Sequence, residues 1–158
     1  MEKEAKTAWV FQINVSDGGL PKRPLPRAEV SAAGVSGDRQ ADLRYHGGPD
    51  RALVLFGLER ILALQKEGHP IYPGSIGENI TLAGLDWSGL QPGQRLRLGT
   101  LEIELTDYAT PCSKIGGSFS KQRFDRVAQK RHPGWSRLCA RVLVGGTVQP
   151  GDQVSLLP

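Results

Sequence analysis

The sequence predicts a mainly β fold, either a barrel or a sandwich, in a single domain over residues 1–158. The 158 residues of the chain match the usual length of one domain. Its 20 glycines and 11 prolines indicate frequent turns, although their share stays below that of low-complexity chains. Short segments rich in β-branched residues recur between these turns, without the regular strand and helix alternation of a doubly wound sheet.

Seven segments have the composition of strands: residues 9–15, 52–56, 78–82, 95–98, 101–106, 137–144 and 153–157. The clearest pair among them is a hairpin. Residues 95–98 and 101–105 each alternate apolar and charged side chains, and Gly99 and Thr100 form a short turn between them. This number of strands is enough to enclose one core.

Two helices are expected between the strands. The first covers residues 58–67, with Gly68 as its stop and one stripe made of Leu58, Ile61, Leu62 and Gln65. The second covers residues 120–131, with an apolar side of Phe124, Val127 and Ala128 and a basic side of Lys121, Arg123, Arg126, Lys130 and Arg131. Residues 18–26 hold three prolines beside Lys22 and Arg23, which predicts an exposed basic loop that serves as a connector.

Composition excludes several classes of protein. The longest apolar run, residues 52–58, is far shorter than the roughly 20 residues of a membrane span, and the charged N-terminus does not match a signal peptide. We therefore expect a soluble, cytoplasmic protein with no membrane contact. Two cysteines cannot build a disulfide framework. The net charge of +4 suits an anionic ligand or nucleic acid.

Cys112 is the most informative thiol. A strand ends near Thr106, and Pro111 keeps the backbone extended just before the cysteine, so the sulfur is expected in a loop at the end of a strand. Lys114 can place a cation near it, and a nearby cation lowers the pKa of a thiol. A reactive thiol and an inert, buried cysteine both remain open from this local context.

Cys139 lies in the middle of a predicted strand among apolar neighbours, so a packing role is favoured. The two-residue period places it on the face of Arg137 and Arg141, where it could line the same cavity as Cys112. A zinc site made of Cys112, His132 and Cys139 lacks a fourth ligand and the usual ligand spacing, and is not expected.

Two glycine-rich segments could bind a ligand. In residues 45–52, the Gly47-Gly48 pair frees backbone amides, and polar groups come from Arg39, His46, Asp50 and Arg51. This loop suits an anion or a heterocycle, although His46 alone could equally be a hydrogen-bonded loop histidine. Residues 73–80 lack the Gly-Lys-Ser/Thr ending of a P-loop and a following helix, so nucleoside triphosphate binding is not expected.

Five motifs in order resemble the MOSC domain family, which is similar to the C-terminal part of molybdenum cofactor sulfurases. They are residues 34–39 (GVSGDR), 46–52 (HGGPDRA), 74–79 (GSIGEN), 110–114 (TPCSK) and 141–152, beginning RVL and ending GD. The motif-bearing region runs from about residue 30 to 158, and small bacterial members of the YiiM type are the nearest likeness. The resemblance implies a MOSC-type, mostly antiparallel β-barrel, closed or partly open, with a few short helices. It also implies binding of the molybdenum cofactor (molybdopterin), and pyridoxal phosphate is not expected.

The resemblance also assigns residues. Cys112 matches the family's cysteine, which would be the protein ligand to molybdenum or the carrier of a persulfide. The cofactor would lie beside the segment of Gly77, Glu78 and Asn79 and opposite the loop of His46, Gly47, Gly48, Asp50 and Arg51. Its phosphate needs cationic or backbone donors, for which Arg39, Arg51 and Lys114 are the candidates.

The function implied is a molybdenum-dependent oxidoreductase that reduces a small N-hydroxylated substrate. The alternative is a non-catalytic carrier of molybdenum cofactor or sulfur. The chain lacks the helical C-terminal extension of YiiM-type proteins and a fused redox domain, so a separate electron-donor reductase or sulfur donor is expected. Nucleic-acid binding is disfavoured because the ten aromatic residues are scattered. The oligomeric state stays open, with a homodimer among the options.

Overall fold

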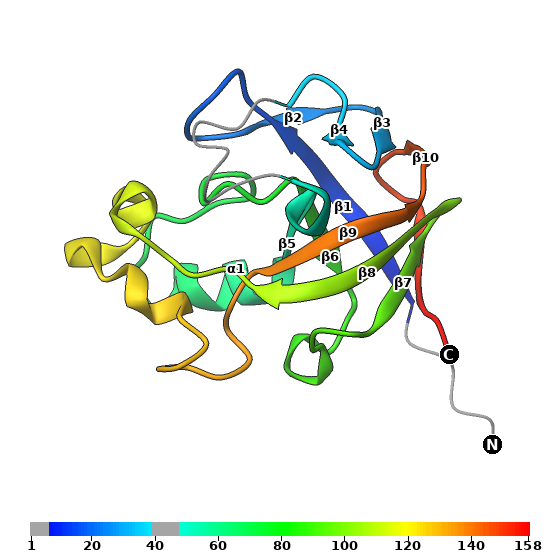
Figure 1. Cartoon of the computed structure of the whole chain (residues 1–158). Helices are drawn as coiled ribbons and strands as arrows, with labels where there is room; N and C mark the ends of the chain where they lie inside the picture. Colours follow the sequence, from blue (N-terminus) through cyan, green and yellow to red (C-terminus); the bar gives the residue numbers. More distant parts are fainter. Residues whose placement is uncertain (1–6, 39–47) are drawn as a thin grey trace.

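The computed structural model of the chain describes residues 7–38 and 48–158 (Figure 1). Arg39, His46 and Gly47, which the sequence analysis selected as ligand-binding residues, lie outside the described residues. The strands are β1 (Ala8–Val15), β2 (Arg23–Leu25), β3 (Ala28–Ser31), β4 (Gly34–Val35), β5 (Leu53–Gly57), β6 (Ile80–Ala83), β7 (Arg95–Leu98), β8 (Leu101–Tyr108), β9 (Leu138–Val144), β10 (Gly146–Val148) and β11 (Gln153–Leu156). The helices are α1 (Leu58–Lys66) and the short 3₁₀ segments η1 (Pro49–Arg51), η2 (Trp87–Gly89), η3 (Ser113–Ser118), η4 (Ser120–Gln122) and η5 (Phe124–Val127).

Seven strands close into a barrel in the order β11-β7-β8-β9-β5-β6-β1. The closing pair is β11 with β1, where Ala8 lies opposite Val154 and Trp9 opposite Gln153. These seven strands correspond to the seven that the sequence predicts, so the closed β-barrel is confirmed. One neighbouring pair, β5 with β6, is parallel, because α1 carries the chain from the end of β5 back to the start of β6.

The predicted hairpin is β7 and β8. Arg95 lies opposite Glu104 and Leu98 opposite Leu101, so the turn is the Gly99-Thr100 pair that the sequence indicates. The charged side chains face outward, where Arg97 and Glu102 form a 2.7 Å ion pair. The apolar residues of both strands are buried in the barrel. This alternation keeps the register of the pair, since a slip of one residue would turn the apolar face outward.

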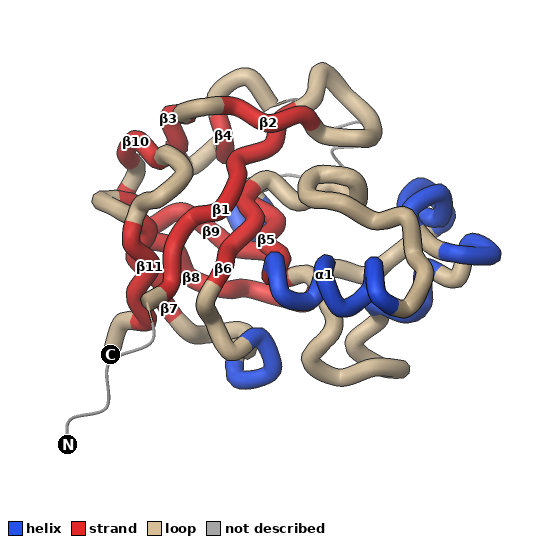
Figure 2. Tube along the Cα trace, turned by 180° about the vertical axis from the view of Figure 1, so that it is seen from behind, coloured by secondary structure: helices blue, strands red, loops and turns tan. Residues whose placement is uncertain are grey.

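Short helical segments and a small second sheet lie at different sides of the barrel. Figures 1 and 2 place α1 and the segments η3 to η5 on one side and the sheet β10-β3-β4 on the other. The core fills the barrel and continues under α1, where Phe56 and Trp87 pack edge to face with ring centroids 5.9 Å apart. No helix among residues 7–38 and 48–158 has the length and apolar composition that crossing a membrane requires.

The stripe predicted for the first helix is wrong by about one position. In α1 the fully buried residues are Ile61 and Leu64, whereas Leu62 is 46% exposed. The apolar residues of this nine-residue helix fit two overlapping stripes. The orientation is selected by packing against β5 and β6, which the local pattern does not contain.

The second predicted helix is also wrong. Residues 120–131 form the separate turns η4 and η5, because Lys121 (φ 55°) and Gln122 (φ 54°) adopt left-handed backbone conformations that break any helix. This turn lets Phe119 before it and Val127 after it both reach the core, where each is buried. The segment is therefore held by two separate buried residues, Phe119 and Val127, and not by the continuous apolar face of one helix.

The prediction of an exposed basic loop at residues 18–26 is wrong in part. Arg23–Leu25 form β2, an edge strand that pairs only with β1, which is the position in a sheet that tolerates proline. Lys22 is buried, with only 7% of its side chain exposed, because Asp38 provides a carboxylate partner at 2.6 Å. A buried ion pair, invisible in the local sequence, thus anchors this connection.

Candidate functional site

The segment of residues 73–79, just before β6, is fixed by close backbone contacts. Gly74 has a φ of 89°, and a Cβ atom there would lie 2.5 Å from the Lys22 carbonyl oxygen. The Lys22 amide donates a hydrogen bond to the Gly74 carbonyl at 3.0 Å. The side-chain amide of Asn14 on β1 donates to the Glu78 carbonyl at 3.1 Å. The glycine is therefore required by the close approach of two chain segments.

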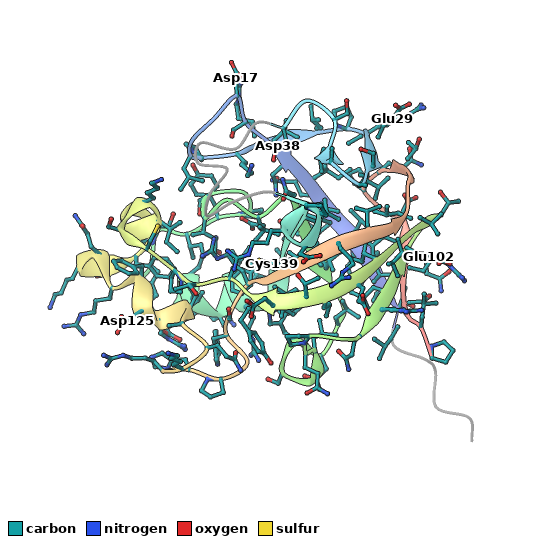
Figure 3. The ribbon with its side chains drawn as sticks, viewed as in Figure 1. Asp17, Glu29, Asp38, Glu102, Asp125 and Cys139 are labelled. Atoms are coloured by element: carbon teal, nitrogen blue, oxygen red, sulfur yellow. The ribbon has the colours of Figure 1, made fainter. Side chains whose placement is uncertain are left out.

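The Asn79 side chain connects three parts of the barrel. Its Oδ1 accepts a hydrogen bond from the Val54 amide at 2.8 Å, and its Nδ2 donates to Asp38 at 2.7 Å. Asp38 also accepts from Lys22 Nζ and from the Ser16 amide, at 2.6 Å and 2.9 Å. Figure 3 labels Asp38 near the carboxyl end of β1. Asn79 is thus in the segment that the sequence selects, with both polar atoms of its side chain bonded within the protein.

Glu78 is fully buried and carries an incompletely satisfied carboxylate. Its Oε2 accepts a hydrogen bond from the Thr81 hydroxyl at 3.2 Å, while Oε1 has no hydrogen-bond partner among the described residues. Burial raises the pKa of Glu78 to about 7, and the nearby backbone of Gly74 and Glu78 and the charge of Arg137 act in the opposite direction. The carboxyl group can therefore hold or release a proton near neutral pH.

Arg137 lies directly before β9 and brings a buried positive charge to the same region. It is 6% exposed, and its Nη1 donates to the Ile76 carbonyl at 2.9 Å. Its Nε has no partner among residues 7–38 and 48–158. Desolvation lowers the pKa of Arg137, and Cys139, Glu78 and Cys112 interact electrostatically with the guanidinium and partly offset this effect. Arg137 thus interacts electrostatically with both cysteines and with Glu78.

Cys112 lies where the sequence predicts it, in the loop that follows β8. The Ala109 amide donates to the Arg137 carbonyl at 3.0 Å, which keeps the start of this loop beside β9. Cys112 has an extended backbone (φ −142°) after Pro111 and precedes η3, whose Ile115 amide donates to the Cys112 carbonyl at 3.1 Å. The residue is partly exposed and its thiol is free. It is not the buried cysteine that was one of the two readings of the local sequence.

Cys139 contrasts with it. The residue is buried in the middle of the sheet, on β9 opposite Val54 of β5 and Asp107 of β8 (Figure 3). Burial raises the pKa of the Cys139 thiol, with the charges of Arg51 and Arg137 opposing this and that of Asp107 adding to it. The packing role that the sequence favours agrees with this position. Arg137 interacts electrostatically with both thiols.

The loop of Gly48, Asp50 and Arg51 packs against the outside of β8 and β9. Gly48 has a φ of 79° before the 3₁₀ turn η1. An Asp50 carboxylate oxygen lies 3.5 Å from Arg141, and the Asp50 carbonyl accepts a hydrogen bond from the Thr106 hydroxyl. Arg51 lies 3.7 Å from Asp107. Arg51 also interacts electrostatically with Cys139, which connects this loop to the region of Arg137.

Two further predicted residues, Gly77 and Lys114, are neighbours in sequence of Glu78 and Cys112. Gly77 has a φ of 85°, as the turn before Glu78 requires. Lys114 is exposed in η3. Arg137 is a cation that interacts electrostatically with Cys112. In the part of the chain that the structure describes, no three His, Cys, Asp or Glu residues are placed to hold a metal ion.

Sequence reasoning missed Arg137 as a site residue. Its position on the predicted face of Cys139 was the available signal, since residues two apart in a strand share a face. What the local pattern could not contain is Glu78 and Cys112 on other elements, which make a buried guanidinium favourable at this point. The combined arrangement offers a partly exposed soft sulfur ligand, a buried cation and a carboxyl group with a pKa near neutrality.

Comparison with protein families identifies the fold family. The family model described as MOSC domain matches residues 42–155, more than half of the chain. The chain belongs to the MOSC domain family. This family is associated with molybdenum cofactor binding. The match covers every predicted site residue except Arg39.

Individual relatives are similar over most of this MOSC chain. The uncharacterized protein YflK of Bacillus subtilis (strain 168) is 31% identical over 141 residues, which are 88% of this chain and 63% of YflK. Protein YiiM of Escherichia coli (strain K12) is 33% identical over 84% of this chain and 57% of YiiM. The chain therefore spans about three fifths of the length of these curated relatives.

A solved structure has the same fold. The crystal structure of YiiM from Geobacillus stearothermophilus superposes with a TM-score of 0.73 at 24% sequence identity. The superposition covers 96% of this chain and 75% of that one. It agrees with the MOSC-type barrel that the sequence resemblance implies.

Proposed function

We propose that this chain binds the molybdenum cofactor with Cys112 as the protein ligand to molybdenum, and that the complex reduces N-hydroxylated compounds. The observation that carries the proposal is the partly exposed Cys112 thiol, which interacts electrostatically with the buried guanidinium of Arg137, within a MOSC domain. A thiolate is a soft ligand. The positive charge of Arg137 compensates the negative charge that a metal-bound thiolate and its oxygen ligands bring into a buried region.

The polar atoms of the site fit such a group. Arg137 Nε and Glu78 Oε1 are both buried and both without a hydrogen-bond partner among the described residues. Buried polar atoms are normally satisfied, so a pair of unpartnered ones beside a free thiol favours a polar ligand. A donor from Arg137 and an acceptor or proton from Glu78 suit an oxygen-rich and nitrogen-rich cofactor.

The proposed reaction removes one oxygen atom from the substrate. A hydroxylamine R–NHOH, two electrons and two protons give the amine R–NH₂ and water, with cleavage of the N–O bond. When bound, the cofactor supplies the two-electron redox centre for this cleavage. Glu78 can hold one proton on its carboxyl group near neutral pH, as its pKa of about 7 requires.

The phosphate of the cofactor needs cationic and backbone donors. We propose Arg51 and Lys114 for this role among the described residues, together with Arg39. The loop of His46, Gly47, Gly48 and Asp50 and the segment of Gly77 and Asn79 would shape the cofactor's surroundings. Asp50 and Asn79 already contact Arg141 and Asp38, so their proposed contribution is to position the two segments.

Metal analysis tests the ligand assignment. The protein is produced in a host that makes molybdenum cofactor, and the parent is compared with Cys112→Ala and with the matched control Cys139→Ala. We expect stoichiometric molybdenum in the parent and the control and loss of molybdenum in Cys112→Ala. Comparable molybdenum in the parent and Cys112→Ala would falsify the assignment.

A second candidate is a carrier of molybdenum cofactor or of sulfur, with no turnover of its own. The two thiols that share the electrostatic field of Arg137 favour it, since a persulfide on Cys112 would gain from the same charge. The assay that separates the candidates supplies electrons from reduced methyl viologen and measures reduction of an amidoxime. Turnover supports the enzyme, whereas bound molybdenum without turnover supports the carrier.

The domain extent and the location of the protein are part of the proposal. We propose one MOSC domain over residues 1–158, because β1 and β2 precede the matched residues 42–155 and yet pair within the barrel sheet. We also propose that it acts in the cytoplasm on a small-molecule substrate, with a separate electron-donor reductase or sulfur donor.

A further inference from the structure

The positive charge of the protein is concentrated in one segment. Residues 113–131, here named the basic lobe, contain six cations, Lys114, Lys121, Arg123, Arg126, Lys130 and Arg131, and one acid, Asp125. The lobe therefore carries +5, more than the whole chain's formal charge of +4. Figure 3 shows Asp125 among nitrogen-tipped side chains that point away from the barrel.

Four of these charges are not compensated. Lys114, Lys121, Arg123 and Lys130 are exposed and have no acidic partner in the described part of the chain. On the barrel wall, by contrast, Arg95, Arg97 and Arg141 each lie within 3.9 Å of a carboxylate oxygen. Uncompensated cations of one sign create a local field that attracts anionic surfaces.

The lobe is held rigidly against the rest of the protein. Ile115, Phe119 and Val127 anchor it in the core, and the Ser118 hydroxyl donates to Ser75 Oγ at 3.0 Å. The Ser75 contact connects the lobe to the segment that carries Glu78. A surface fixed in this way loses little conformational entropy when a partner binds.

A second contact holds the end of the lobe. The guanidinium groups of Arg60 and Arg126 lie 4.2 Å and 4.1 Å from the ring centroid of Trp135. Arg126 also donates two hydrogen bonds, at 2.9 Å and 2.8 Å, to the carboxylate of Glu67, the residue that follows α1. Arg126 is thus a structural cation, and the docking charge comes from the exposed Lys121, Arg123 and Lys130.

We propose that the basic lobe is the docking surface for the acidic face of an electron-transfer protein that supplies the reductase reaction. This inference rests on the proposed function, whose reaction consumes two electrons. The lobe begins at Ser113, directly after Cys112, so a partner seated on it lies next to the proposed cofactor site. Complementary charge increases the rate of encounter and selects the orientation of the partner.

Other anionic partners fit this surface less well. Binding of single-stranded nucleic acid uses exposed aromatic platforms, whereas Phe119 is buried and Trp135 lies between two guanidinium groups. Insertion into a lipid surface uses exposed apolar side chains, and no large apolar residue of segment 113–131 is exposed. An acidic protein surface requires neither feature.

The test compares two charge reversals of equal size. The lobe variant is Arg123→Glu with Lys130→Glu, and the control is Arg23→Glu with Arg27→Glu, which are exposed cations at and beside β2. Amidoxime reduction by the molybdenum-loaded protein is measured with two donors, a reduced acidic flavodoxin and reduced methyl viologen. Binding of oxidised flavodoxin is measured by calorimetry at low and high salt.

With flavodoxin, we expect kcat/KM of the lobe variant to fall about tenfold at low salt, and binding to weaken by a similar factor. Both variants keep the parent's rate with methyl viologen, which needs no docking surface. A lobe variant that equals the parent with flavodoxin overturns the proposal, as does an equal loss with both donors or absence of flavodoxin binding by the parent.

Two further outcomes are distinguishable. If the parent binds flavodoxin through the lobe but shows no turnover with methyl viologen, the docking surface stands and the reductase function fails. If the lobe variant loses binding to single-stranded DNA or to phosphatidylserine vesicles while flavodoxin kinetics are unchanged, the lobe serves a different anionic partner and the proposal is overturned.

Discussion

Cys112 and Cys139 interact with the same guanidinium but differ in burial and in the backbone element that carries them. Both interact electrostatically with Arg137. Cys112 follows a proline in a loop and is partly exposed, whereas Cys139 is the second residue of β9 and is buried. Burial raises the pKa of Cys139, which keeps that thiol protonated. The difference shows that the position of a cysteine in a loop or in a strand, more than a nearby positive charge, determines whether its thiol is accessible to a ligand.

The largest expected effect separates the two thiols directly. In the folded protein, iodoacetamide should modify Cys112 about a thousandfold faster than Cys139, because the buried thiol reacts only after local opening. Mass spectrometry of Cys112→Ala and Cys139→Ala measures each site separately. In urea the two rates should become similar. Equal rates in the folded protein would contradict the comparison.

Removing the shared cation should destabilise the fold. Arg137→Met removes the hydrogen bond from Nη1 to the buried Ile76 carbonyl and a positive charge that favours ionised Glu78, so we expect a loss of about 3 kcal/mol in the free energy of unfolding. The double variant with Glu78→Gln should recover part of this loss. Urea denaturation measures all three proteins, and additive effects of the two substitutions would show that the groups do not interact.

The carboxyl group should make stability depend on pH. The pKa of Glu78 is raised from 4.5 to about 7, so the folded state holds this proton more tightly than the unfolded state. The stabilising effect of the bound proton is lost as pH rises from about 4.5 to 7, by about 3 kcal/mol in total. Glu78→Gln should remove this decline relative to the parent. Urea unfolding at a series of pH values measures it, and parallel curves would refute the assignment.

The smallest effect concerns the hydroxyl that contacts Glu78. Thr81 donates to the Glu78 carboxylate at 3.2 Å and lowers its pKa. Thr81→Val should cost about 1 kcal/mol and move the pH transition of stability upward. Thr106→Val, which removes a hydrogen bond from a β8 hydroxyl to the Asp50 carbonyl, is the control that should leave this transition in place.

Much of the barrel could be predicted because its strands have a strong local signal. The alternation of residues 95–98 and 101–105 predicts both strands and the turn of the β7–β8 hairpin. The strands that escaped prediction, β2, β3, β4 and β10, have two to four residues each. A strand of two or three residues, such as β2, β4 or β10, has too few alternating positions for recognition, and its existence depends on a neighbour such as β1 for β2.

The candidate site was predicted in part for a similar reason. Pro111 and the end of β8 place Cys112 in a loop from local chemistry alone, and motif resemblance adds Glu78 and Asn79. Arg137 could not be assigned to the site from local sequence. Its role depends on electrostatic interactions with Glu78 and Cys112, which come from other parts of the chain. Lys114 was the closer cation in sequence, yet its side chain is exposed.

The amino-acid sequence alone determined the β-rich class, the seven barrel strands, the loop position of Cys112 and the family resemblance, because each follows from local patterning or ordered motifs. Only the tertiary structure decided which face of α1 is buried, that residues 120–131 break into turns, and that Lys22 and Arg137 are buried cations. Those outcomes depend on long-range burial, in which a charge or an apolar face is stable only where a remote segment supplies its partner.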